Sequence, residues 1–90
     1  MAEFLIEVYA PQHEPSAAVR ARIAAEEMTR EGTPVRYLRS IFVPEDETCF
    51  YLNEARSAEA VRAAAARAEL RSDHLAEAVT EPRGADDELE

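Results

Sequence analysis

The 90-residue sequence contains no lysine, one cysteine and two glycines, and it has no long hydrophobic run. With one cysteine the chain cannot form an internal disulfide, and a lone thiol is typical of a reducing cytoplasm. A helix that spans a bilayer needs about 20 apolar residues, so no membrane span is predicted. Gly32 and Gly84 are too few and too far apart for a glycine-rich phosphate loop. These absences predict a cytoplasmic protein that does not act at a membrane.

The charged residues are strongly biased toward acids. All ten basic residues are arginines, which together with the excess of alanine indicates the codon bias of a GC-rich genome, as in actinobacteria. The formal net charge is −9, and residues 81–90 contribute −4 of it, from five acids and Arg83. An acidic body argues against nucleic-acid binding, because that affinity comes mainly from neutralising phosphates. We expect one domain over residues 1–80 and a disordered acidic tail over residues 81–90.

The periodicity of apolar residues predicts strands and helices in alternation. The predicted strands are Glu3–Tyr9, Val35–Val43, Thr48–Glu54 and Leu75–Thr80. One predicted helix runs from an N-cap at Ser16 to about Glu31, where Gly32 would end it. A second helix is expected to follow a cap at Ser57.

This order of elements is the β-α-β-β-α-β pattern of the ferredoxin-like α+β fold. Right-handed crossovers place the first and third strands in the middle of a four-stranded antiparallel sheet, with both helices on one face. The open face is expected to carry Leu5, Glu7, Tyr9, Cys49, Tyr51 and Asn53. That face is too apolar to be left to water, so a second copy of the chain is expected to cover it. The sequence therefore predicts a homodimer that forms a dimeric α/β barrel.

Candidate metal ligands are expected to meet at one end of the sheet. They come from the loop after the first strand (His13), the hairpin turn (residues 45–47), and the starts of the third and fourth strands (Cys49 and His74). Imidazole, thiolate and carboxylate together suit nickel or zinc, although no ligand-spacing motif is present. The alternatives are an exposed loop histidine at His13, a plain strand start at His74, and a small buried hydrophobic residue at Cys49.

Glu7 is a charged residue in the middle of a predicted central strand. If a second chain covers this face, the carboxylate needs a cation or a hydrogen-bond donor to stabilise its charge. The alternative is a structural ion pair with Arg36 or Arg39. The same strands are expected to form a small polar pocket, which would be lined by Glu7, Tyr9, Tyr51 and Asn53.

Four short segments carry a resemblance to a known family, namely residues 31–40, 43–48, 54–55 and 57–62. Through them the chain resembles an uncharacterised bacterial family of small ferredoxin-like proteins that includes an actinobacterial nickel-binding protein. The resemblance covers about Phe4 to Thr80 and implies the ferredoxin-like fold, a dimer and nickel as the bound metal. Members of that family commonly end the second helix with glycine, where this chain has Glu69.

Three hypotheses for function remain open at this point. The first is a cytoplasmic, homodimeric metal-binding protein, with nickel favoured by the resemblance, no catalysis claimed, and four candidate ligands: His74, Cys49, Glu7 and His13. The second is a small-molecule-binding or enzymatic dimeric α/β barrel of the monooxygenase type, with Glu7 as the base in its pocket. The third is a structural interaction module.

Overall fold

A computed structural model describes residues 1–79 and 81 of the chain. The elements in chain order are β1 (Ala2–Tyr9), α1 (Pro15–Arg30), β2 (Val35–Val43), a short 3-10 helix (Pro44–Asp46), β3 (Thr48–Ala55), α2 (Ala58–Arg67) and β4 (His74–Ala78). The predicted β-α-β-β-α-β order is confirmed. The predicted acidic tail lies, apart from residue 81, outside the described residues, as does Thr80, the predicted end of the last strand.

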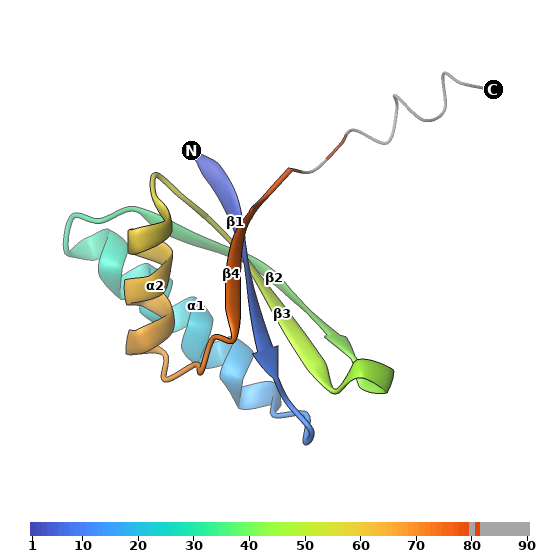
Figure 1. Cartoon of the computed structure of the whole chain (residues 1–90). Helices are drawn as coiled ribbons and strands as arrows, with labels where there is room; N and C mark the ends of the chain where they lie inside the picture. The colour runs from blue at the N-terminus through green and yellow to red at the C-terminus, as the bar shows by residue number, and fades with distance from the viewer. Residues whose placement is uncertain (80, 82–90) are drawn as a thin grey trace.

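The four strands form one antiparallel sheet in the order β2-β3-β1-β4. The first and third strands therefore lie in the centre, as predicted. Both helices cover one face of this sheet and leave the other face open (Figure 1). This is the predicted ferredoxin-like α+β fold.

The helices begin with different local signals. α1 begins at Pro15, one residue before the predicted cap, because the fixed φ and missing N–H of proline suit the first helical position. The Ser16 hydroxyl instead accepts a hydrogen bond from Arg20 Nη1 at 3.4 Å. At α2 the predicted cap is confirmed, since Ser57 Oγ accepts a hydrogen bond from the Ala60 N–H at 3.2 Å.

Both helices end in residues with a left-handed backbone. Gly32, with φ of 104°, ends α1 as predicted, and the Thr33 N–H closes the turn on the Met28 carbonyl at 2.9 Å. After α2 the corresponding position is Glu69, with φ of 58°. A side chain in this conformation costs about 1 kcal/mol relative to glycine.

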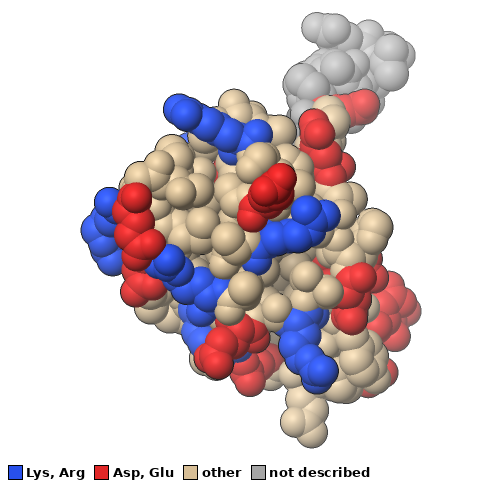
Figure 2. All heavy atoms as spheres, turned by 60° about the vertical axis from the view of Figure 1, so that its left-hand side comes forward, with Lys and Arg blue, Asp and Glu red and all other residues tan. Residues whose placement is uncertain are grey.

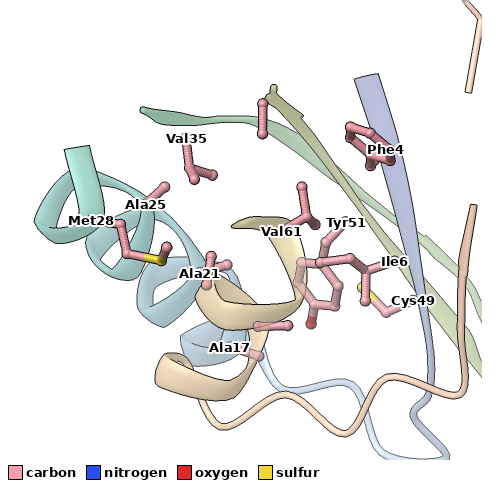
Figure 3. Packing of buried hydrophobic residues seen from close by; sticks show 13 residues of the cluster. Phe4, Ile6, Ala17, Ala21, Ala25, Met28, Val35, Cys49, Tyr51 and Val61 are labelled. Carbon is pink, nitrogen blue, oxygen red and sulfur yellow. The ribbon is translucent and has the colours of Figure 1, made fainter. Parts of the chain in front are cut away.

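The core lies between the sheet and the helices and combines large residues of the strands with small residues of the helices (Figure 3). Its main members are Phe4 and Ile6 of β1, Cys49 and Tyr51 of β3, Ala17, Ala21, Ala25 and Met28 of α1, and Val61 of α2. Alanine has little bulk, which favours close packing of α1 on the sheet.

Ion pairs connect the helices on their outer side. Arg67 of α2 donates two hydrogen bonds to the Glu31 carboxylate, at 2.7 and 2.8 Å. Its Nη1 also lies 3.6 Å from Glu27 Oε1 of α1. These hydrogen bonds from Arg67 hold the pKa of the Glu31 carboxyl below its ordinary value. Acidic and arginine side chains are interspersed over this side of the molecule (Figure 2). Among the described residues, no helix has the length and apolar character needed to cross a membrane.

The contrast between a buried and an exposed isoleucine tests this core. Ile6 is 1% exposed and Ile23, on the outer side of α1, is 42% exposed. We expect Ile6→Ala to lower the free energy of unfolding by about 2–5 kcal/mol, because it leaves a cavity. Ile23→Ala should change it by less than about 0.5 kcal/mol, as is usual at exposed sites. Urea denaturation measures both changes, and equal losses would contradict the packing described.

Candidate functional site

Three connecting segments converge at one end of the sheet, as the sequence predicted. Tyr9, the last residue of β1, donates its backbone N–H to Asp73 Oδ2 at 2.6 Å, and the Asp73 N–H bonds to the Glu7 carbonyl at 2.8 Å. The Ala10 N–H bonds to the Glu47 carbonyl at 2.6 Å. The loop after β1, the hairpin turn and the start of β4 are therefore held together by hydrogen bonds.

The pairing of β1 with β3 decides which side chains share a face. Residues that lie directly opposite each other on antiparallel strands point to the same side. The three pairs that matter are Phe4 with Asn53, Ile6 with Tyr51, and Val8 with Cys49. Phe4 and Ile6 belong to the core under the helices, and so their partners on β3 lie on that side too.

The prediction that Cys49, Tyr51 and Asn53 share the open face with Glu7 is therefore wrong. Glu7 pairs instead with Phe50, since successive side chains of a strand point to opposite faces. The pocket predicted from Glu7, Tyr9, Tyr51 and Asn53 is not formed in the structure, because Glu7 lies on the open face whereas Tyr51 and Asn53 are buried on the helix side.

The open face does bring together two of the predicted metal ligands. His74 of β4 lies directly opposite Glu7 of β1 in the antiparallel pairing. Opposite residues have their Cβ atoms about 4.5–5.5 Å apart, so one imidazole and one carboxylate extend from neighbouring positions. Glu7 forms no ion pair with any described residue. Arg36, one of its predicted partners, lies next to Glu54 instead, with 3.9 Å between Arg36 Nη1 and Glu54 Oε1.

The other two predicted ligands lie elsewhere. Cys49 is buried on the helix side of the sheet, and its thiol is free. His13 stacks on the ring of Phe42, with 4.4 Å between ring centroids and 21° between planes. Within residues 1–79 and 81, no group of three or more His, Cys, Asp or Glu is placed to hold a metal ion. One chain thus offers a pair of ligands, His74 and Glu7, and not a complete site.

Apolar side chains make up much of the open face around this pair. By the strand register they are Leu5 of β1, Ile41 and Val43 of β2, Phe50 and Leu52 of β3, and Ala76 of β4. Arg39 of β2, the other predicted partner of Glu7, lies on the same face opposite Leu52. Ile41 is 46% exposed. In one chain this face is open to solvent (Figure 1).

On the helix side a hollow of about 440 Å³ lies at the same end of the sheet, and sequence reasoning missed it. Cys49 and Tyr51 line it from β3, and Arg20 lines it from α1. A signal was present, because Arg20 follows the buried Ala17 by three positions, which puts both on one side of the helix. Burial raises the pKa of the Tyr51 phenol, and the neighbouring Cys49 thiol raises it further.

Comparisons with known proteins agree with this fold. The sequence profile of the family described as "Nickel responsive protein SCO4226-like" matches residues 4–78. The crystal structure of SCO4226 from Streptomyces coelicolor A3(2) superposes with a TM-score of 0.69 at 22% sequence identity, covering 90% of this chain and all of that one. At this identity the structural likeness shows the fold alone. No curated protein sequence matches the chain.

The buried phenol gives a prediction for alkaline pH. In the unfolded chain a tyrosine loses its proton near pH 10, whereas burial keeps Tyr51 protonated in the folded state. The contribution of Tyr51 to stability is therefore retained below about pH 10 and falls above it. We expect the urea midpoint to fall more between pH 9 and pH 11 in the wild type than in Tyr51→Phe. Tyr9→Phe, at an exposed position, is the matched control, and an identical pH dependence in all three proteins would contradict the assignment.

Proposed function

The chain belongs to the family of nickel responsive SCO4226-like proteins, and from this premise we propose that it is a cytoplasmic nickel-binding protein that acts as a homodimer. The observation that carries the proposal is the His74–Glu7 pair on the open, apolar face of the sheet. The free thiol of Cys49 is consistent with a reducing compartment.

The chemistry of the pair fits nickel. Imidazole nitrogen is a common ligand of nickel, and carboxylate oxygen completes many first-row metal sites. His74 starts β4 and Glu7 lies in the central strand β1, so the backbone of the sheet holds both ligands. Two ligands from one chain are fewer than a tight transition-metal site needs, and the described residues add no third.

A second copy of the chain would supply the missing ligands. In a dimer with two-fold symmetry the same surface of each chain is used, so each ligand occurs twice. If the open faces pack on each other, two imidazoles and two carboxylates become available at the interface. The apolar residues around the pair would be buried in the same step, which stabilises the dimer by the hydrophobic effect.

The dimer predicts a specific effect of charge on the open face. We expect Ile41→Glu to convert a dimer into a monomer, because a carboxylate buried without a partner costs several kcal/mol. Ile23→Glu is the matched control, since Ile23 is similarly exposed but lies on α1, away from the sheet. Sedimentation velocity measures the masses. A monomeric wild type, or a dimer that survives Ile41→Glu, would contradict packing through this face.

The metal site predicts different behaviour of the two histidines. We expect tag-free, chelator-treated protein to bind nickel with saturation, and His74→Ala to weaken binding at least about tenfold, which is about 1.4 kcal/mol. His13→Ala should leave the affinity unchanged, because His13 stacks on Phe42 away from the pair. Isothermal titration calorimetry gives affinity and stoichiometry. Equal binding by the two variants, or no saturable binding by the wild type, would refute the proposed site.

A further inference from the structure

The hollow on the helix side has the size and lining of a small-molecule site. Its volume of about 440 Å³ lies within the range of about 300–1,000 Å³ that is usual for ligand pockets. Apolar groups of Val8, Ala17 and Leu70 contribute to its walls, and Arg20 and Tyr51 add polar groups. The sheet separates it from the His74–Glu7 pair, so an occupant of this hollow would not touch the proposed metal site.

Arg20 is held in place with hydrogen-bonding capacity left over. Its Nε donates a hydrogen bond to the Ala68 carbonyl at 2.9 Å. Its Nη1 lies 2.9 Å from Glu14 Oε1 and donates a hydrogen bond to Ser16 Oγ at 3.4 Å. A guanidinium has five N–H groups, and the two on Nη2 have no acceptor among residues 1–79 and 81. These contacts fix the side chain before any ligand arrives, which lowers the entropy that binding would cost.

Tyr51 provides a second donor in the same hollow. The residue is 4% exposed. Its hydroxyl is hydrogen-bonded with the Cys49 thiol, which is a weak acceptor. In Figure 3 the Tyr51 hydroxyl points away from the strand toward Ala17 at the start of α1. The positive charge of Arg20 also acts on this phenol, lowering its pKa against the larger effect of burial.

The other charges around the hollow limit the charge of its occupant. Glu14 is paired with Arg20. Glu69 and Arg71, which carry opposite charges, both line the hollow and offset each other. The two donors therefore match one anionic group, while the Glu14 and Glu69 carboxylates disfavour a second one.

We propose that this hollow binds a small monocarboxylic acid with an apolar body, whose carboxylate accepts hydrogen bonds from Arg20 and Tyr51. The apolar part would lie against Val8, Ala17 and Leu70. This activity is independent of nickel binding and does not rest on it.

Benzoate and benzamide test the proposal on the unchanged, full-length protein. They have the same shape, but only benzoate carries the anionic group. In chelator-treated protein, titrations followed by two-dimensional ¹H–¹⁵N NMR should show saturable shifts of Val8, Arg20 and Tyr51 with benzoate. Benzamide should bind at least about tenfold more weakly, because hydrogen bonds to a charged group contribute more than neutral ones. Phthalate, a dianion, should also bind more weakly than benzoate.

Single substitutions then test whether the Tyr51 hydroxyl donates a hydrogen bond to the ligand carboxylate. Tyr51→Phe should weaken benzoate binding about tenfold, the usual effect of losing a hydrogen bond to a charged group. Tyr37→Phe, on β2 and outside the hollow, is the matched control and should bind as the wild type does. Nickel titration of Tyr51→Phe should match that of the wild type, which separates the two proposals. If Tyr51→Phe fails to fold, the benzoate–benzamide comparison on wild type still decides.

Three results with the wild type would overturn the proposal. They are equal affinity for benzoate and benzamide, shifts confined to residues of the open face, and the absence of any saturable shift. Equal benzoate affinity of Tyr51→Phe and the wild type would also overturn it, since the phenol would then play no part.

Discussion

The pairing register of β1 with β3 is the constraint on which the other features depend. Side chains of a strand alternate between faces with a period of two, so a slip by one residue would exchange the two faces. With the register observed, Phe4 and Ile6 lie under the helices and Glu7 faces outward. The bond from the Ala10 N–H to the Glu47 carbonyl extends this pairing into the loops. The packing of the core and the position of each candidate site follow from it.

One sheet consequently carries two chemically different surfaces at the same end. The open side presents an imidazole and a carboxylate, His74 and Glu7, among apolar residues. The helix side presents the Arg20 guanidinium and the Tyr51 phenol around a hollow. The two proposals accordingly assign a cation to the first side and an anion to the second. The sheet between them keeps these groups apart, so the two proposals involve no shared ligand atom.

The fold was predictable from the sequence because its signals are local. Alternation along each strand, the cap at Ser57 and the glycine after α1 each depend on a few neighbouring residues. The face of β3 was mispredicted because both of its alternating sets are apolar, Cys49 and Tyr51 on one side and Phe50 and Leu52 on the other. Glu54 carried the missing signal: it shares a side with Leu52, and a carboxylate is rarely buried under helices. The opposition of His74 and Glu7 depends on pairing between distant segments, which no local pattern contains.

The alanine-lined face of α1 has a thermodynamic consequence. Alanine loses no side-chain rotamer freedom on folding, so ordering Ala17, Ala21 and Ala25 costs mainly backbone entropy. Unfolding the same face exposes less apolar area than leucine or isoleucine would expose at those positions. Because the heat-capacity change of unfolding grows with the apolar area exposed, this interface contributes little to it. A small heat-capacity change flattens the curve of stability against temperature. The helix layer therefore favours a protein whose stability varies little between cold and warm conditions.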